Sequence, residues 1–157
     1  MAERGSRHVS KKGSDDKRQI TATLSETLSG KILPFQLIYK GKTKRSIPSS
    51  KFPAVFLLSA NPKHWSNEAE TIKLLHEVIQ PYLEKTKEEL HLEDSQKSCI
   101  VWDAFKGQDT PAVKSKLQEL NIEEVRVPKN MTHLFQPLDL TTNSTVKNIE
   151  KREFTAA

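Results

Sequence analysis

The chain has 157 residues, a length typical of one compact domain with a core of ordinary size. Hydrophobic residues make up 35% of it and charged residues 29%, a polar balance that indicates a thin core or flexible ends. The net charge of +5 favours anionic partners, nucleic acid above all. The single cysteine, Cys99, excludes an internal disulfide and a cysteine-rich zinc site, and it favours a reducing compartment.

The sequence predicts neither a membrane span nor a secretory signal. The longest apolar stretch, Ala54–Ala60, is too short to cross a bilayer, so no membrane partner is expected. Residues 1–18 are polar and carry both charges, without the apolar core of a signal peptide. We expect residues 1–18 to form mostly loop and one domain to occupy residues 19–154.

The segment that begins at Ile20 is typical of a β-hairpin. Apolar and polar residues alternate from Ile20 to Ser25, which is the period of a half-buried strand. Gly30 lies in the turn, and the run Ile32–Tyr39 returns. Because Pro34 cannot donate to a β-ladder, we expect the returning strand to lie at a sheet edge or to carry a bulge.

A short third strand, Ala54–Ala60, and a long helix come next. Ser66 or Asn67 can cap the helix, and Glu70 would complete a capping box with Asn67. Pro81 predicts a kink or an end in this helix. The apolar residues of the helix share one face: Ile72, Leu75, Ile79 and Leu83.

The second half of the chain alternates strands with helices. The stretch SCIVWDAF predicts a buried strand in which Cys99 and Trp102 belong to the core. Residues 108–122, QDTPAVKSKLQELNI, predict a helix capped by Asp109 or Thr110. A short strand then lies within residues 123–130, and the final helix has a thin apolar stripe: Val146, Ile149 and Phe154.

The order of these elements is β-β-β-α-β-α-β-α. An antiparallel start followed by βαβ units predicts a mixed α/β sheet with helices on its faces.

Two aspartates follow neighbouring strands of this predicted sheet. Asp103 ends the SCIVWD strand, and Asp139 lies in QPLD, beyond the next strand. Because functional groups gather at the carboxyl ends of strands in open α/β sheets, both carboxylates can reach one site. Oxygen ligands of this kind hold Mg²⁺. A single aspartate at a strand end is more often a cap or turn residue, so position alone suggests a metal site without specifying one.

The stretch from Val101 to Asn148, VWDAFKGQDTPAVKSKLQELNIEEVRVPKNMTHLFQPLDLTTNSTVKN, resembles the DDE superfamily endonuclease domain of pogo/Tigger-type transposases. The same family includes jerky-like and centromere protein B-like proteins. The segments DDKRQITATLSETLSGKILPFQLIYKGKT and HWSNEAETIKLL are similar to that domain's hairpin and first helix. The resemblance spans roughly residues 3–152.

The resemblance implies an RNase H-like fold and DNA cleavage and strand transfer that depend on Mg²⁺ or Mn²⁺. It assigns the second catalytic acid, a metal ligand, to Asp103 and the third to Asp139. The family's first acid lies on a strand upstream of the part that ERGSRHV resembles, and residues 1–157 match neither that strand nor a helix-turn-helix region. We therefore expect an RNase H-like sheet without its first strand and a chain that is catalytically inactive by itself.

The absent strand would lie between the hairpin and the Asp103 strand. Without it, two rows of backbone donors and acceptors are left to pair with a partner, to self-associate or to face water. We therefore expect a marginally stable domain, or one that assembles with another chain. The competing hypothesis is a non-catalytic module that binds DNA or protein.

A basic cluster follows the hairpin: Lys40, Lys42, Lys44 and Arg45. It is a candidate for contacts with DNA phosphates, as are Lys11, Lys12, Lys17 and Arg18, and the alternative is a solvated surface loop. No aromatic residue interleaves with these charges, and Trp65 is expected to pack as a hydrophobic staple before the helix cap. The family resemblance implies a nuclear location, although residues 11–18 are a poor import signal; the alternative is the cytoplasm.

Overall fold

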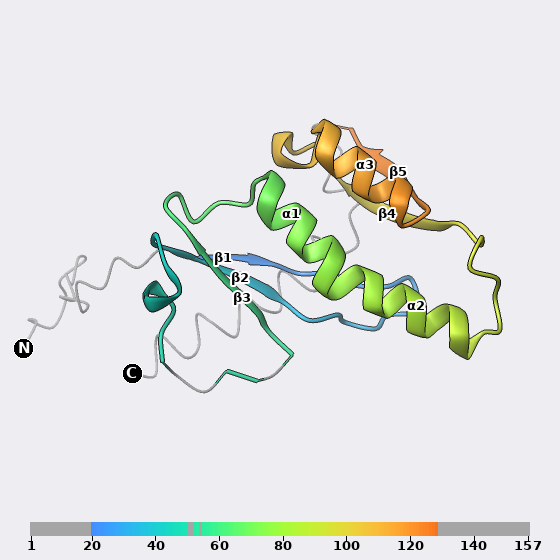
Figure 1. The fold of residues 1–157 in the computed structure, drawn as a ribbon, viewed down its shortest axis with the longest axis horizontal. Helices are drawn as coiled ribbons and strands as arrows, with labels where there is room; N and C mark the ends of the chain where they lie inside the picture. Colours follow the sequence, from blue (N-terminus) through green and yellow to red (C-terminus); the bar gives the residue numbers. More distant parts are fainter. Residues whose placement is uncertain (1–19, 50–51, 54, 129–157) are drawn as a thin grey trace, which may run out of the picture.

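The computed structural model describes residues 20–49, 52–53 and 55–128 of the chain. It confirms a mixed α/β architecture. The predicted final helix and Asp139 lie outside the described residues. The helices and strands in chain order are β1 (Ile20–Thr23), β2 (Gln36–Lys40), β3 (Leu57–Asn61), α1 (Glu68–Leu74), a π-helical turn (Leu75–Ile79), α2 (Gln80–Glu89), β4 (Ser98–Asp103), α3 (Pro111–Glu119) and β5 (Ile122–Val127), with short 3₁₀ turns at Lys44–Ser46 and Lys106–Gln108 (Figure 1).

The described strands form two sheets. In the first, of order β1-β2-β3, β1 runs antiparallel to β2, and β3 runs parallel to it. The second contains β4 and β5 in parallel. A single sheet is not formed because no described strand pairs with the outer edges of β1 and β4. Figure 1 shows β2, β3, β4 and β5 running toward the same end of the molecule.

The predicted hairpin is confirmed, with one correction. Gly30 adopts a φ of 80°, a left-handed conformation that glycine accepts without strain, and its N–H donates to the carbonyl of Thr27. Strand β2 is central in its sheet, so the edge position expected from Pro34 is wrong. The reason is that pairing in β2 begins at Gln36, beyond the proline.

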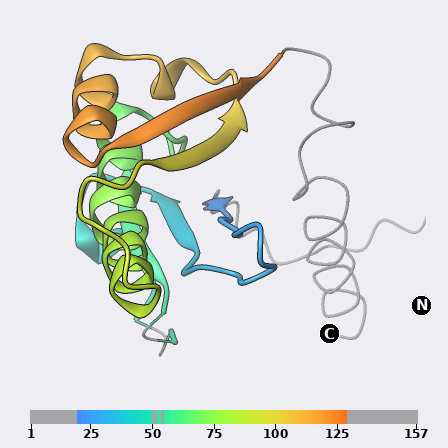
Figure 2. The same cartoon turned by 90° about the vertical axis from the view of Figure 1, so that its right-hand side faces the viewer.

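All described helices pack on one side of the two sheets (Figure 2). The core lies between these layers and contains Leu75 from the π-helical turn, Trp102 from β4 and Val113 from α3. The prediction for helix α3 is confirmed, because the Thr110 hydroxyl accepts from the N–H of Val113 at its start. The expected helices on the other sheet face stay a prediction. Within the described residues, no helix is long and apolar enough to span a membrane.

The long helix does not end at Pro81. Its π-helical turn ends at Ile79, two residues before the proline, and the N–H of Gln80 donates to the carbonyl of Leu75, five residues earlier. Proline lacks an N–H, and its ring clashes with the preceding turn of a regular α-helix. The wider turn accommodates both defects, so the helix continues to Glu89.

A buried carboxylate joins helix α1 to the first sheet. Asn67 caps α1 by accepting from the N–H of Glu70, as predicted, but the Glu70 side chain does not complete a capping box. It turns inward and is 7% exposed. One of its carboxylate oxygens accepts from Gln36 Nε2 at 3.0 Å and from Ser59 Oγ at 2.7 Å. The other accepts from Asn61 Nδ2 at 3.5 Å, and Gln36 also donates to the Glu70 carbonyl at 2.9 Å.

We predict that Glu70→Ala lowers the free energy of unfolding by about 3 kcal/mol, because it leaves the buried donors of Gln36 and Ser59 without their acceptor. Urea denaturation followed by circular dichroism measures the change. The matched control is Glu68→Ala, since Glu68 is exposed in the same helical turn. Equal effects of the two substitutions would show that the Glu70 carboxylate contributes nothing specific.

Candidate functional site

Asp103 is the last residue of β4, as the sequence predicted. The alternation of the strand buries Trp102 and leaves the Asp103 side chain exposed. Among the described residues, its carboxylate has no hydrogen-bond donor or cation as a partner. An accessible carboxylate without a competing cation is suited to a hard divalent ion.

The loop after Asp103 packs against the start of helix α1. A side chain at Gly107 would place its Cβ 2.7 Å from the Phe105 ring and 3.0 Å from the Cα of Asn67. Only a glycine lets the loop backbone approach the helix cap this closely. The N–H of Phe105 also donates to the carbonyl of Asp103 at 3.0 Å. The strand end that carries Asp103 is therefore fixed relative to α1.

Arg126 of β5 holds the far side of this loop. Its guanidinium donates to the Gln108 carbonyl at 3.4 Å and lies 3.2 Å from the Asp109 carboxylate. Lys114 contacts the same carboxylate at 2.7 Å. The hydrogen bond from Lys114 and the charge of Arg126 lower the pKa of Asp109. Glu124, 3.0 Å from the guanidinium, raises the pKa of Arg126, chiefly through their hydrogen bond.

The predicted basic cluster forms an exposed turn, residues 40–45, at the carboxyl end of β2. The side chains of Lys40, Lys42, Lys44 and Arg45 are all exposed. Gly41 makes the turn possible, since a Cβ there would lie 1.9 Å from Ser46 Oγ. The Gly41 N–H donates to the Asn61 carbonyl, which ties the turn to β3. The other predicted basic residues, Lys11, Lys12, Lys17 and Arg18, lie outside the described residues.

The basic turn and Asp103 lie at the same end of the molecule, where β2, β3 and β4 finish and α1 begins (Figure 1). Two contacts join them through the α1 region: Gly41 bonds to Asn61, and Gly107 packs on Asn67. This end of the described structure therefore carries both exposed cationic side chains and an accessible carboxylate.

At this end Trp65 is exposed and His64 is half-buried. The sequence pattern did not indicate either residue as functional. Trp65 is 62% exposed, so the predicted hydrophobic staple is wrong. Its indole N–H donates to His64 Nε2 at 3.1 Å, and Asn61 Nδ2 donates to its carbonyl. These polar contacts hold the ring beside the strand end. The sequence feature that could have indicated a functional role for Trp65 is its place as an aromatic residue in a polar strand-to-helix loop, NPKHWSN.

Strand β4 is less buried than its apolar sequence predicted. Cys99 is exposed and not a core residue, and Val101 is 48% exposed on the same face. The alternation explains this, because both residues point away from the helical layer that covers Trp102. No described element covers that face.

Of the two proposed metal ligands, only Asp103 is among the described residues. No group of three His, Cys, Asp or Glu side chains there is placed to hold a metal ion. Asp139 lies outside these residues, so its position beside Asp103 stays a prediction.

Comparison with known proteins identifies the family. The model of a family described as "DDE superfamily endonuclease" matches residues 17–156. This chain belongs to that family. Two relatives, from Homo sapiens and Mus musculus, are named pogo transposable element with KRAB domain, and each is 26% identical to this DDE domain over 126 residues. The alignment covers 80% of the chain but 19% of each relative, so the chain spans about a fifth of their length. No solved structure matches the domain.

Proposed function

We propose that this chain is a transposase-derived, RNase H-like domain that binds DNA, retains two metal-ligating acids and does not cleave DNA by itself. The observation that carries the proposal is the shared end of the molecule: Asp103 ends β4 there, and the basic turn 40–45 ends β2 there. The domain occupies residues 19–154 in this proposal, and it acts in the nucleus.

The basic turn supplies the affinity for DNA. Lys42, Lys44 and Arg45 project from a short loop, so they reach successive phosphates without burying their charges. Trp65, held by His64 and Asn61 after β3, is exposed and offers a ring face for stacking on an unpaired base. Contacts of this kind position a nucleic acid but read little of its sequence.

Asp103 and Asp139 would hold Mg²⁺ or Mn²⁺ on the DNA at this end. The exposed Asp103 carboxylate, free of any described cation, fits such an ion. When bound, the metal would stabilise the charge that develops on a phosphate during hydrolysis. Residues 1–157 match only two of the family's three catalytic acids, and we propose that this set binds metal without supporting cleavage.

We predict that replacing Lys42, Lys44 and Arg45 by glutamine weakens binding to duplex DNA and flattens its salt dependence. If each contacts one phosphate, the slope of log K against log salt decreases in magnitude by about 2.7. Fluorescence anisotropy over a salt series measures both quantities. The control removes three charges at the opposite end, Lys85→Gln, Lys87→Gln and Lys97→Gln, and an equal change there would contradict a specific role for the turn.

We also predict Mn²⁺ binding at millimolar concentration that weakens in Asp103→Asn and in Asp139→Asn, with no cleavage of supercoiled plasmid. Water-proton relaxation detects the metal, and gel electrophoresis detects nicking. Glu123→Gln is the control, because Glu123 is exposed on β5 and pairs with Lys97. Metal-dependent nicking that both aspartate substitutions abolish would instead establish an active nuclease, whereas unchanged metal binding would remove both acids from the proposed site.

A second candidate function is a protein-interaction module, and the unpaired strand edges favour it. Strand β1 pairs only with β2, and β4 only with β5, among the described residues. Ile20 on β1 and Val101 on β4 are each about half exposed. Such edges accept an added strand from another chain.

We predict that the isolated chain self-associates through these edges, and that its thermal midpoint rises with protein concentration. Sedimentation velocity and differential scanning calorimetry test this over a range of concentrations. Ile20→Lys and Val101→Lys should reduce association, while Leu28→Lys, at an exposed hairpin turn, should not. A cooperative transition far above body temperature that does not depend on concentration would contradict the prediction.

A further inference from the structure

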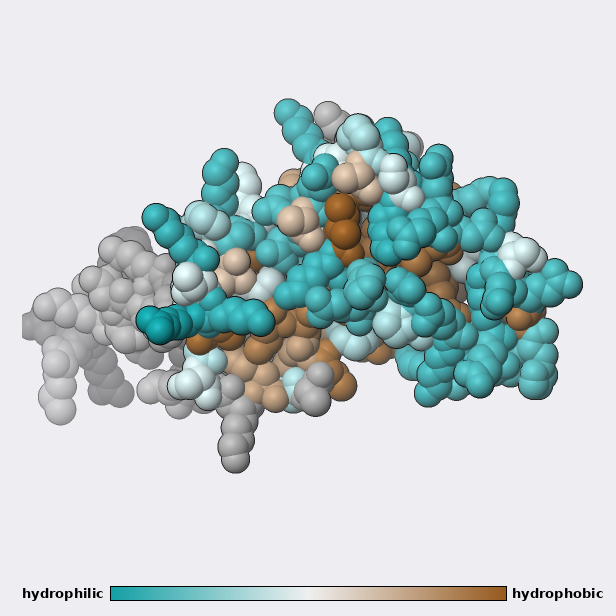
Figure 3. Space-filling model, in the orientation of Figure 1, coloured by the Kyte–Doolittle hydropathy of each residue, from teal (hydrophilic) through white to brown (hydrophobic). Residues whose placement is uncertain are grey.

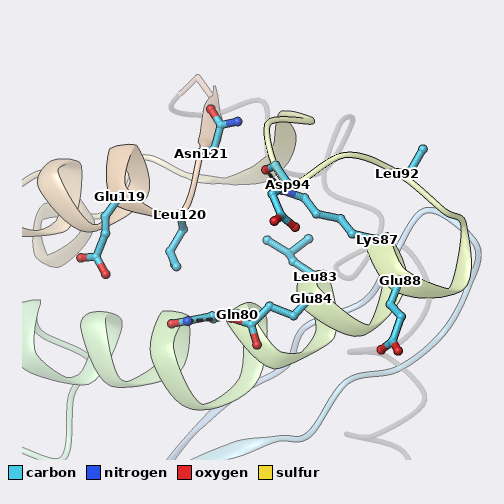
Figure 4. A pocket seen from close by; sticks show the side chains of 10 residues that line it. All are labelled: Gln80, Leu83, Glu84, Lys87, Glu88, Leu92, Asp94, Glu119, Leu120 and Asn121. Atoms are coloured by element: carbon cyan, nitrogen blue, oxygen red, sulfur yellow. Dashed lines mark hydrogen bonds between the residues drawn. The ribbon is translucent and has the colours of Figure 1, made fainter.

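A groove lies at the opposite end of the molecule from the basic turn. It encloses about 620 Å³ between helix α2, the loop before β4 and the corner that joins α3 to β5 (Figure 4). The proposed DNA-binding function uses none of its residues. The lining side chains are Gln80, Leu83, Glu84, Lys87, Glu88, Leu92, Asp94, Glu119, Leu120 and Asn121.

Leucine side chains supply the apolar part of the groove. Figure 4 shows Leu120 directed toward α2 and Leu83 rising from α2 toward the loop that carries Asp94. Leu92 also lines the groove and is 43% exposed, and Figure 4 shows it apart from Leu83 and Leu120 and directed away from α2. Figure 3 shows apolar surface between α2 and the α3 layer, bordered by hydrophilic side chains. Leu83 and Leu120 are half-buried and pack against the core, so each still presents part of its side chain to the groove. Apolar side chains that line a hollow are typical of a binding surface.

The rim of the groove is acidic, although the whole chain is basic. Glu84, Glu88 and Asp94 have no cationic side chain as a partner in the part of the chain that the structure describes. The fourth carboxylate, Glu119, is paired with Lys116 at 2.7 Å. The one lining cation, Lys87, donates at 2.7 Å to the backbone carbonyl of Asp94 and does not neutralise a carboxylate.

We infer that this groove binds a basic peptide segment of a partner protein, with a leucine-type side chain seated between Leu83 and Leu120. The rim carboxylates have no cationic partner among the described residues, although Glu84 accepts a hydrogen bond from Gln80 at 2.8 Å, so they complement lysine or arginine. Leu83 and Leu120 complement an aliphatic side chain. Nucleic acid does not fit, because its phosphates would face Glu84, Glu88 and Asp94. A second copy of the basic turn does not fit, since residues 40–45 (KGKTKR) offer no aliphatic side chain to the leucines.

The position of the groove allows two ligands at once. The basic turn and Asp103 lie at the carboxyl ends of the strands, and the groove lies at the end where β4 and β5 begin (Figure 1). A basic partner in the groove therefore leaves the opposite end open to DNA, and it does not compete for the phosphate-binding side chains.

The test uses the full chain and a fluorescein-labelled, lysine-rich peptide with two leucines one helical turn apart. Fluorescence anisotropy should show saturable binding that a glutamate-rich version of the peptide lacks. Glu84→Gln with Glu88→Gln, and separately Leu120→Ser, should each weaken binding by about tenfold. The matched control, Glu68→Gln with Glu77→Gln, removes two exposed carboxylates outside the groove and should leave the affinity unchanged.

Amide chemical shifts locate the bound peptide independently of the variants. We expect perturbations in residues 80–94 and 119–121, and none in residues 40–46. Equal weakening by the groove and control variants would overturn the inference, as would perturbations that centre on the basic turn. Displacement of the peptide by a DNA duplex, with shifts of the same groove residues, would overturn it too.

Discussion

The buried Glu70 carboxylate is the interaction on which the arrangement of the site depends. It joins β2, β3 and the first turn of α1 through Gln36, Ser59 and Asn61. The same end of α1 receives the loop after Asp103 at Gly107. The basic turn is fixed to β3 through the carbonyl of Asn61. One polar cluster thus sets the positions of both the carboxylate at the end of β4 and the cations beyond β2.

Such a cluster has a particular energetic character. A buried carboxylate is tolerated when its oxygens accept several hydrogen bonds, and removal of the acceptor leaves costly unpaired donors. Hydrogen bonds also demand specific directions, whereas the apolar contacts around Leu75 and Val113 tolerate small shifts. The carboxylate therefore contributes most to the uniqueness of the packing between helix and sheet. For a domain with exposed strand edges, that directional constraint limits how far helix α1 can move from the first sheet.

Sequence patterns predicted the features that depend on neighbours in the chain. The hairpin turn at Gly30, the Thr110 cap and the inward side of Trp102 follow from local chemistry and from the alternation of a strand. Features that depend on distant partners were missed. The Glu70 side chain was expected to bond within its own helix, but Gln36, 34 positions away, offers a buried donor. Cys99 was expected in the core because the strand is apolar, but only one face of β4 is covered. Asp103 was found from its place at a strand end, and the exposed Trp65 ring was missed because its loop context favoured a packed residue.

The π-helical turn at Leu75–Ile79 rotates the side chains of α2 around the helix axis relative to those of α1. A turn of this type holds one residue more than an α-helical turn, and one residue corresponds to a rotation of about 100° around the axis. Side chains of α1 therefore face the sheets, while Leu83 on α2 faces the groove. One inserted residue therefore sets the angle, around the helix axis, between the side chains of α1 and those of α2. A lineage that lost this residue would keep the amphipathic pattern of each half-helix but would turn Leu83, Glu84 and Glu88 together away from Leu120 on the other side of the groove.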